Sequence, residues 1–598
     1  MEKTINEVFK NRADKYKKRL AIEKKLNGVW RGASWNEYYD KSRAVGLGLY
    51  DLGVRKGDRV SILSDNRLEW LYTDMGTLGI GAVLIPIYLT VPDKEVAYII
   101  ENSESKILVV ENKTQLEKAI YIKNHYTGLE KIIIIEDLEN YPKYNFIMGF
   151  NELMSRGKNN SAVFEDLASS VEPEDLATIV YTSGTTGIPK GAMITHKNIM
   201  AVIKSLDSVT PKYAADKDQS VPFLPLSHVF ERAAGHFYGM YVGITSSYAE
   251  SINTILQDIQ EKKPTIMLAV PRVCEKVYQR ILMQVEKQPS WRKDIFYWGH
   301  KIGTEISALR EAKKNVPMLL DIQYKIAYFL IFKKLAEALG GRVRWMTASG
   351  APTSREIILF FNAAGIQVIE GYGMTECFAP ATMSNLADYK IGTVGRPIPG
   401  VDIKIAPDGE ILVKGDNVFK GYWKMEKETK DAFTEDGYLM SGDIGMFDSD
   451  GFLTITDRKK DLIITSGGKN VAPQKIENMF KSDPLFSQFI VIGDQKKFLS
   501  ALVNINLDTA VEVAKANNIS YEKPQELLNN EKFVKIIEEH VSEKNNSLAK
   551  YETIKRFQVI KNEFSQEGGE LTPSLKVKRK VVHNKYKEII DSMYEEKI

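Results

Sequence analysis

The sequence is poor in several features that mark particular classes of protein. Its two cysteines, Cys274 and Cys377, stand far apart, which excludes a disulfide framework and a cysteine metal cluster and fits a reducing compartment. The 81 basic residues nearly balance the 78 acidic ones, and a net charge of +3 gives no reason to expect nucleic acid as a partner. The N-terminal residues are charged throughout and contain no apolar signal-peptide core.

Long apolar runs are also missing. The longest, such as residues 82–91, reach about ten residues, whereas a membrane-spanning helix needs about 20. The segment IAYFLIF (326–332) could form a face that touches a membrane, but a buried helix leading into KKLAEALGG is the favoured interpretation. We therefore expect a cytoplasmic protein without a spanning helix, and peripheral contact at the inner membrane face stays open.

A chain of 598 residues is too long for one ordinary core and predicts several domains or subdomains. Short apolar runs alternate with helical patterns, which predicts an α/β fold of parallel sheets covered by helices. The predicted strands lie in 59–65, 106–111, 131–137, 265–272 and 342–352. A charged helical insertion is expected at about 285–325. From about Gly392 short strands alternate with Gly, Pro and Asp turns, which predicts a β-rich subdomain over about 392–458.

The segment YTSGTTGIPKG (181–191) concentrates backbone freedom, hydroxyl groups and one cation. Gly184 and Gly187 let the backbone approach a ligand, and successive N–H groups in such a turn can bind an anion. The side chains of Ser183, Thr185, Thr186 and Lys190 add donors and charge. A polyphosphate is the expected ligand, although Lys190 stands too far from Gly187 for the Walker pattern. A flexible surface hairpin is the competing interpretation.

Further motifs follow in a fixed order, and together they resemble the adenylate-forming, AMP-binding superfamily over nearly the whole chain. They are SGAP (349–352), EGYGMTE (370–376), GYW (421–423), SGD (441–443), DRKKDLIITSGGKNVAP (457–473) and LTPSLKVKRK (571–580). SHVFERAAG, PRVCEKVY and the helical insertion resemble the long-chain fatty acyl-CoA synthetases within it. The resemblance implies a large N-terminal domain over 1–458 and a small mobile α+β C-terminal domain over 459–598.

The resemblance also implies a role for each motif residue. Tyr372 stacks on adenine, Thr375 contacts the α-phosphate, and Thr185 with Glu376 holds Mg²⁺, for which a carboxylate is a suitable hard ligand. Asp443 and Arg458 bind the ribose, and Lys576 enters the site during adenylation, although Leu575 replaces the glycine that usually precedes this lysine. The other residues expected to bind ATP or AMP are Thr182, Ser183, Gly184, Thr186, Gly187, Lys190, Gly350, Ala351, Pro352, Glu370, Gly371 and Gly373.

The remaining expectations concern the acyl group, the thiol and the hinge. By resemblance, His228 lies along the acyl pocket, Gly467, Gly468 and Lys469 line the thiol's approach, and Lys460 is the hinge. A catalytic base is not needed, because a carboxylate is already a nucleophile near neutral pH. Residues 223–230 contain no acidic side chain that could hold a substrate ammonium group, which disfavours an amino-acid substrate.

The resemblance therefore predicts a long-chain fatty acid–CoA ligase. ATP and the acid would give an acyl-adenylate and pyrophosphate, and CoA would then take the acyl group and release AMP. Three alternatives stay open: a fatty acyl-AMP ligase that loads a carrier protein, a CoA ligase for a medium-chain or aryl acid, and a degenerate binding scaffold. The scaffold is disfavoured because Glu376, Asp443, Arg458 and Lys576 are all present.

Overall fold

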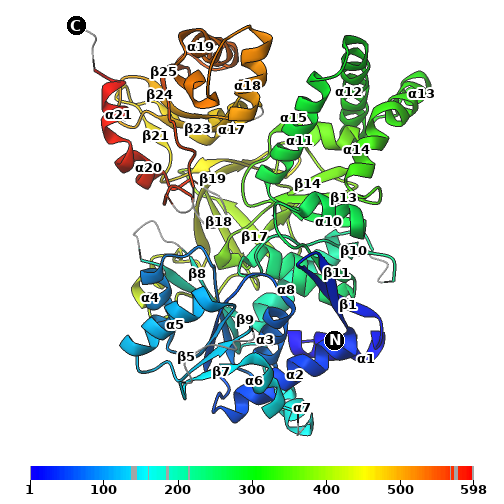
Figure 1. Ribbon diagram of the computed structural model, residues 1–598, viewed down its shortest axis with the longest axis vertical. Helices are drawn as coiled ribbons and strands as arrows, with labels where there is room; N and C mark the ends of the chain where they lie inside the picture. The colour runs from blue at the N-terminus through cyan, green and yellow to red at the C-terminus, as the bar shows by residue number, and fades with distance from the viewer. Residues whose placement is uncertain are drawn as a thin grey trace.

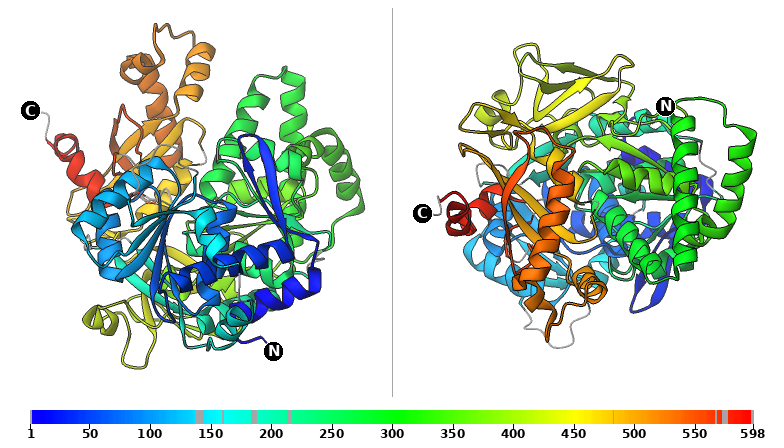
Figure 2. Two further views of the ribbon diagram at one scale, coloured as in Figure 1. Left: turned by 60° about the horizontal axis from the view of Figure 1, so that its bottom comes forward. Right: turned by 90° about the horizontal axis from the view of Figure 1, so that it is seen from above.

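The computed structural model describes residues 2–136, 144–158, 161–182, 188–212, 216–481, 483–565, 568–571 and 577–595. Figure 1 shows two large sheets with their helices in the body of the molecule and the elements after β20 gathered in a separate lobe. The two views of Figure 2 show the same lobe standing beside the helices of the 271–338 segment. The expected α/β class, with parallel sheets and a β-rich subdomain, is confirmed.

One large sheet carries the phosphate-loop motif at its edge. Its described strands are parallel from β7 to β8, and β9 closes the edge antiparallel to β8. The predicted strands at 59–65, 106–111 and 131–137 are all present here. In spatial order the strands are β7 (Ile147–Gly149), β6 (Lys131–Ile134), β5 (Ser105–Val110), β3 (Arg59–Leu63), β4 (Val83–Ile87), β8 (Leu176–Thr182) and β9 (Lys190–Thr195).

The second large sheet carries the SGAP and GYGMTE motifs. Its centre is parallel, and both ends finish in antiparallel pairs. In spatial order the strands are β16 (Arg396–Pro397), β15 (Thr382–Met383), β14 (Gln367–Tyr372), β13 (Trp345–Ser349), β12 (Ile266–Ala269), β10 (Gln219–Ser220), β11 (Thr245–Tyr248), β1 (Leu20–Leu26) and β2 (Val29–Ser34). The N-terminal β1–β2 hairpin therefore completes a sheet formed mostly by residues after 218.

Helices cover both large sheets, and two of them start at a capping box that the sequence carries. A capping box of Ser34 and Glu37 begins α2, and one of Thr195 and Asn198 begins α8. The described helices that precede residue 250 are α1 (Ile5–Tyr16), α2 (Trp35–Asp51), α3 (Leu68–Gly79), α4 (Asp93–Ser103), α5 (Lys113–His125), α6 (Phe150–Arg156), α7 (Ser161–Ser169), α8 (His196–Val209), the π-helix η1 (Glu231–Phe237) and α9 (Tyr238–Val242).

The expected helical insertion is longer than predicted and packs on the β12–β14 part of the second sheet. Its elements are α11 (Pro271–Glu286), α12 (Ser290–Glu311), α13 (Met318–Ala327), the π-helix η2 (Tyr328–Phe332) and α14 (Lys333–Ala338). Helix α10 (Ile255–Lys262) precedes β12 and α15 (Arg355–Ala363) follows β13, so both stand outside the insertion. The buried-helix interpretation of 326–332 holds only in part. Ala327 and Phe332 are buried, but Ile326, Phe329 and Leu330 are exposed, because only one side of this helix faces the core.

The β-rich subdomain is an antiparallel sheet of β17 (Val401–Ile405), β18 (Glu410–Gly415), β19 (Leu439–Phe447) and β20 (Leu453–Arg458), with the short α16 (Glu426–Lys430) between β18 and β19. The C-terminal lobe follows with β21 (Ile463–Ile464), β22 (Asn470–Val471), α17 (Pro473–Lys481), β23 (Phe486–Ile492), β24 (Leu499–Ile505), α18 (Leu507–Ala516), η4 (Pro524–Asn529), α19 (Glu531–Asn545), β25 (Ile554–Val559), α20 (Arg579–Lys585) and α21 (Lys587–Ser592). The domain boundary at 458/459 stays a prediction and falls in the turn after β20.

Candidate active site

The predicted phosphate loop joins two antiparallel strands at the edge of the first sheet. Thr182 ends β8, Lys190 begins β9, and the two residues are paired in register. The predicted phosphate ligands between them, Ser183, Gly184, Thr185, Thr186 and Gly187, lie outside the described residues. Because the flanking strands are paired up to these two residues, both ends of the loop are held in place by the sheet.

Strand β9 connects the loop to the metal-ligand candidate through the GYW motif. The backbones of Met193 and Gly421 are hydrogen-bonded (N···O 3.0 Å), and Trp423 N donates to Gly191 O at 2.8 Å. The Lys190 Nζ lies 5.0 Å from the centre of the Tyr422 ring. The Tyr422 hydroxyl donates to Glu376 Oε1 at 2.8 Å. Three motifs that are widely separated in the sequence therefore meet at Tyr422.

The predicted wall of the adenine pocket is built on β13 and β14. These strands are parallel, with Ser349 opposite Gly371, and Ser349 Oγ donates to Gly371 O at 2.8 Å. Gly350 follows with a φ of +93°, which suits glycine, and begins the turn that contains Ala351 and Pro352. The buried Glu370 accepts the backbone N–H of Thr353 at 3.2 Å. Burial raises the pKa of Glu370 to about 7.

Glu370 therefore ties the turn that follows Gly350 to strand β14 through the backbone of Thr353.

The predicted ribose-binding pair lies on neighbouring strands of the β-rich subdomain. Asp443 on β19 and Arg458 on β20 are register partners, and Arg458 Nε lies 3.4 Å from Asp443 Oδ1. The Tyr372 hydroxyl donates to the other carboxylate oxygen, Oδ2, at 2.7 Å. Burial, with Asp443 as the second cause, raises the pKa of the Tyr372 hydroxyl well above its ordinary value. The adenine and ribose candidates thus form one connected group across two sheets.

The donor set around Glu376 suits a magnesium ion. Mg²⁺ in phosphate-handling sites is held by one or two carboxylates together with oxygens of the substrate phosphates. Glu376 lies in the short η3 helix (Thr375–Cys377), one residue after Thr375, the candidate for the α-phosphate. No group of three or more His, Cys, Asp or Glu side chains within the described ranges could enclose a metal without such a substrate.

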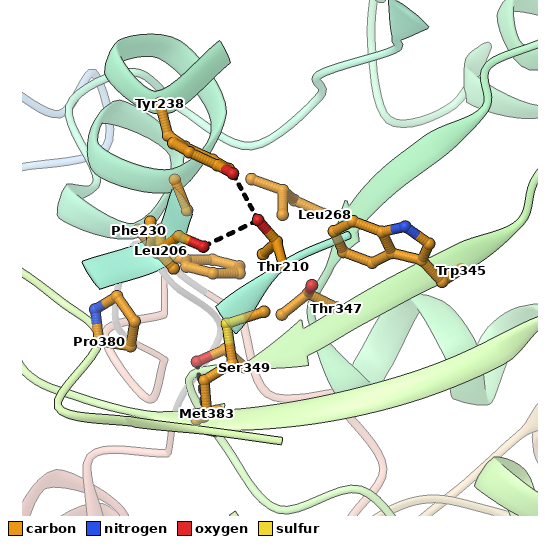
Figure 3. Close-up of a pocket in the computed structure, with 12 residues that line it drawn as sticks. Leu206, Thr210, Phe230, Tyr238, Leu268, Trp345, Thr347, Ser349, Pro380 and Met383 are labelled. Carbon is orange, nitrogen blue, oxygen red and sulfur yellow. Dashed lines mark hydrogen bonds between the residues drawn. The ribbon is translucent and has the colours of Figure 1, made fainter. Parts of the chain in front are cut away.

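An apolar pocket lies against the same strands. Its twelve lining residues are uncharged, and Figure 3 shows Tyr238 reaching from its helix towards Thr210, with Leu268 and Thr347 on the strands beside it. Thr210 Oγ1 donates to Leu206 O at 2.8 Å and is also hydrogen-bonded to the Tyr238 hydroxyl. The lining residues are Leu206, Thr210, Phe230, Ala234, Tyr238, Leu268, Trp345, Thr347, Ser349, Gly371, Pro380 and Met383.

Ser349 and Gly371 belong both to this pocket and to the adenine wall. An apolar ligand in the pocket would therefore lie beside the predicted adenine wall.

Residues 9–423 match the AMP-binding enzyme family, and residues 460–598 match the AMP-binding enzyme C-terminal domain. The chain belongs to the AMP-binding enzymes. It is 34% identical over 589 residues to the long-chain-fatty-acid–CoA ligase FadD15 of Mycobacterium bovis, covering 96% of this chain and 94% of the relative. It is 33% identical over 635 residues to the long-chain-fatty-acid–CoA ligase ACSBG2 of Xenopus laevis, covering 99% and 84%.

Solved structures share the fold of this AMP-binding enzyme at low identity. The adenylation domain of a carboxylate reductase from Mycobacterium chelonae superposes with a TM-score of 0.77 at 22% identity, covering 99% of this chain and 91% of that one. The anthranilate CoA ligase AuaEII in complex with anthranoyl-AMP superposes with a TM-score of 0.74 at 17% identity, covering 98% of each chain.

Sequence reasoning missed a buried ion pair that holds η1, a helix beside the apolar pocket, against strand β8 before the predicted phosphate loop. Arg232 Nε donates to Asp74 Oδ2 at 3.0 Å, and Arg232 Nη1 donates to Thr178 Oγ1 at 2.8 Å. Asp74 lies on α3 and Thr178 on β8, while Arg232 lies on η1. The signal available in the sequence was a single Asp inside the apolar helix LEWLYTDMGTLG, a position where a carboxylate is seldom left unpaired.

The neighbouring Glu231 does not share that pair. It is fully buried, and both carboxylate oxygens lack a hydrogen-bond partner in the part of the chain that the structure describes. A Cβ at Gly235 would lie 2.0 Å from Glu231 Oε1, so glycine at that position makes room for the carboxyl group. Burial raises the pKa of Glu231 to about 8.

His228 lies just before η1, near the pocket but not among its lining residues. Its Nδ1 accepts the backbone N–H of Phe230 at 3.1 Å, and its ring lies edge-on to Tyr88. Phe230, two residues further on, does line the pocket. This contact with the backbone is a structural one, and the expectation that His228 is not a catalytic base stays a prediction.

The C-terminal candidates are partly described. Lys460 lies in the turn after β20, and Gly467, Gly468 and Lys469 form an exposed turn between β21 and β22. Thr465 N donates to Lys469 O at 3.0 Å across that turn. Lys576, the predicted adenylation lysine, lies outside the described residues.

Proposed function

We propose that this AMP-binding enzyme activates a long-chain fatty acid with ATP and transfers the acyl group to CoA. The observation that carries the proposal is the shared wall of the two sites. Ser349 and Gly371 line the apolar pocket and also belong to the strands β13 and β14, which carry the proposed adenine wall. An apolar chain in the pocket would present its carboxylate towards the nucleotide, and the names of the relatives above support this substrate class.

In the first step a carboxylate oxygen attacks the α-phosphorus of ATP, and the bond to pyrophosphate breaks. Such a transfer depends mainly on positioning and on stabilising charge. Asp443 and Arg458 would hold the ribose, Tyr372 would fix Asp443, and Lys190 would place a cation near the phosphates. Glu376 would hold Mg²⁺ at the phosphates, where the ion neutralises charge. The resulting acyl-adenylate is a mixed anhydride.

In the second step the CoA thiolate attacks the acyl carbonyl carbon, and AMP leaves. Gly467, Gly468 and Lys469 are proposed to line the thiol's approach, and Lys576 is proposed to serve the first step only. Arg579, in the same basic run, donates to both carboxylate oxygens of Glu477 at 2.7 and 2.6 Å. Because Arg579 is held by Glu477, Lys576 is the better candidate for the basic residue that enters the site.

The test is release of pyrophosphate and AMP by the full chain, measured over fatty acids of graded length, aryl acids and amino acids, with and without CoA. We expect long-chain acids to give the highest rates and AMP turnover to require CoA. Pyrophosphate exchange triggered by amino acids alone would contradict the substrate class. If long-chain acids are adenylated but the acyl group is never transferred to CoA, the result would favour an acyl-AMP ligase that loads a carrier protein.

A further inference from the structure

The outer side of α13 and η2 exposes an unusual series of large apolar side chains. Met318, Leu319 and Phe329 are 81%, 69% and 68% exposed. With Ile322, Ile326 and Leu330, which are also exposed, they form a set that we call the α13 stripe. Monomeric proteins seldom leave large apolar side chains grouped on one surface unless that surface binds something.

The stripe lies on one side of a well-anchored helix. Its members recur at intervals of three, four and seven residues, a spacing that places them on one helical face. The opposite face, with Leu320, Tyr324 and Phe332, is buried in the core over α12 and α15. A Cβ at Gly299 on α12 would lie 2.3 Å from a methyl carbon of Ile331, which shows how closely the helices pack. The exposure is therefore not due to a loosely packed segment.

Both Figure 1 and Figure 2 place α13 at the outer edge of the molecule. Among the described residues no helix is long and apolar enough to cross a bilayer. Contact with a membrane would therefore have to be made from its surface.

The segment around the stripe is strongly basic. Residues 310–334 contain six basic and two acidic side chains, which gives this segment a net charge of +4. The net charge of the whole chain is only +3. Lys325 and Lys333 each lie one helical turn from members of the stripe, with side chains 73% and 52% exposed. Their partners, Asp321 and Glu337, are on the same helical segment, and exposed pairs of this kind are weak.

We propose that the α13 stripe docks this protein on the surface of an anionic phospholipid bilayer. The helix lies in the plane of the interface, the six apolar side chains enter the acyl boundary, and the lysines reach the lipid phosphates. An amphipathic helix with apolar residues on one face and lysines beside them binds membranes in this way, through buried apolar area together with charge. Long lysine stems can follow the apolar surface while their charges stay in water.

The charge pattern favours a bilayer over a second copy of the chain. In a two-fold symmetric contact the same patch meets itself, so the face that carries Lys325 and Lys333 in one copy would be brought against the face that carries them in the other. Like charges brought together oppose such a dimer, whereas an anionic surface attracts both of them. The proposal is independent of the acid that the enzyme activates.

One experiment places a reporter on the stripe. Cys274 and Cys377 are both buried, so an environment-sensitive dye coupled to the full-length variant Leu319→Cys reports from that position alone. We expect its emission to shift to the blue with vesicles of phosphatidylcholine and phosphatidylglycerol, and much less with phosphatidylcholine alone. The matched control, Val29→Cys, places the dye on an exposed residue of β2 and should not respond.

A second experiment measures vesicle co-sedimentation. The double variant Leu319→Ser/Phe329→Ser should lose at least about tenfold in affinity for the anionic vesicles, because two large apolar side chains leave the interface. Lys325→Glu/Lys333→Glu should lose a similar factor, and added salt should weaken wild-type binding. The control Val29→Ser/Met446→Ser, at two other exposed apolar positions, should bind like the wild type.

Three results would overturn the proposal. In the first, the wild-type chain binds neither kind of vesicle. In the second, the Leu319→Ser/Phe329→Ser variant binds as tightly as the wild type. In the third, sedimentation velocity shows a wild-type dimer that Phe329→Ser dissociates.

Discussion

Tyr422 is the residue at which the phosphate-loop strand, the GYW motif and the metal-ligand candidate meet. Its hydroxyl fixes one oxygen of Glu376, and a hydrogen bond to a charged group contributes about 1.5–3 kcal/mol. We therefore expect Tyr422→Phe to lower the rate of ATP–pyrophosphate exchange by about tenfold or more and to raise the Mg²⁺ concentration needed for half-maximal rate. The measurement is exchange at a series of Mg²⁺ concentrations.

Tyr121→Phe, at an exposed tyrosine on α5, is the matched control, and Glu376→Ala sets the full effect of losing the carboxylate. An unchanged rate and Mg²⁺ dependence in Tyr422→Phe would contradict the role given to this hydroxyl.

Glu231 makes the stability of the protein depend on pH. Its ordinary pKa of 4.5 is raised to about 8 in the folded state, so between these values the folded state binds more protons than the unfolded state. The stability contributed by this group is therefore present at low pH and falls as pH rises towards about 8. Glu231→Gln cannot ionise, so its free energy of unfolding should increasingly exceed that of the wild type from pH 5 to pH 8.

The expected difference at pH 8 is a few kcal/mol in order of magnitude, measured by urea denaturation at both pH values. Glu117→Gln, at an exposed position on α5, is the matched control. If the free energy of unfolding of Glu231→Gln differs from that of the wild type by the same amount at both pH values, the buried carboxyl does not titrate in this range.

The turn between β14 and η3 depends on an element-scale contact at Gly373. A Cβ at Gly373 would lie 2.9 Å from the Cα of Pro380 and 3.0 Å from that of Ala379. These are backbone atoms, so they can give way only if the chain moves. We expect Gly373→Ala to displace the turn that follows Tyr372 and precedes Thr375, and to reduce adenylation by at least about tenfold, since small misplacements of catalytic groups are costly.

Gly149→Ala is the control, because a Cβ there would meet nothing within 4 Å. Both variants should be compared by ATP–pyrophosphate exchange and by thermal unfolding. Full activity in Gly373→Ala would show that the turn tolerates the extra methyl group.

Elements with a strong local signal could be predicted from the sequence. The strands β3, β5 and β6 are uninterrupted apolar runs, and the β8–β9 hairpin is two apolar runs around a Gly-rich turn. Contacts that depend on strand order could not be predicted, such as the pairing of β1 with β11. The hydrogen bonds from Tyr422 to Glu376 and from Tyr372 to Asp443 join residues 46 and 71 positions apart, and no local pattern encodes them.

The exposed side of α13 was also not predictable, for a different reason. Apolar residues at helical spacing indicate an apolar face but do not say whether another element covers it. In residues 326–332 both faces carry apolar side chains, and only the packing of α12 and α15 decides which face is buried. Adjacent charged residues pose a similar problem, since Arg232 pairs with Asp74 while Glu231 points elsewhere.

At the scale of the whole molecule, the C-terminal lobe meets the body partly through polar contacts between described residues. Gln279 on α11 donates to Lys481 O at 3.4 Å, and Lys287 lies 3.7 Å from Glu512 on α18. Near the turn after β20, Gln474 N donates to Asp457 Oδ2 at 3.0 Å. Domains that meet through polar contacts such as these are expected to move relative to each other.

The proposed chemistry requires such a movement, because two different parts of the lobe must serve one site in turn. Lys576 is proposed for adenylation, and the turn of Gly467, Gly468 and Lys469 is proposed for the thiol, so both cannot occupy the site at once. Lys460 is the proposed pivot, since it lies in the turn between β20 and the lobe. A pivot must change its φ and ψ substantially, whereas proline fixes φ near about −65°.

We therefore expect Lys460→Pro and Lys576→Ala to separate the two half-reactions in opposite directions. Lys460→Pro should keep at least part of the ATP–pyrophosphate exchange and lose thioester formation from preformed acyl-adenylate. Lys576→Ala should lose exchange and keep thioester formation. Lys460→Ala removes the charge but leaves the backbone free, so it should keep both steps and isolate the effect of the fixed φ. Both steps could instead fall equally in Lys460→Pro and in Lys576→Ala, with unchanged circular dichroism. That result would contradict the proposal that the lobe rotates between the two half-reactions. The turn after β20 would then be only a connection.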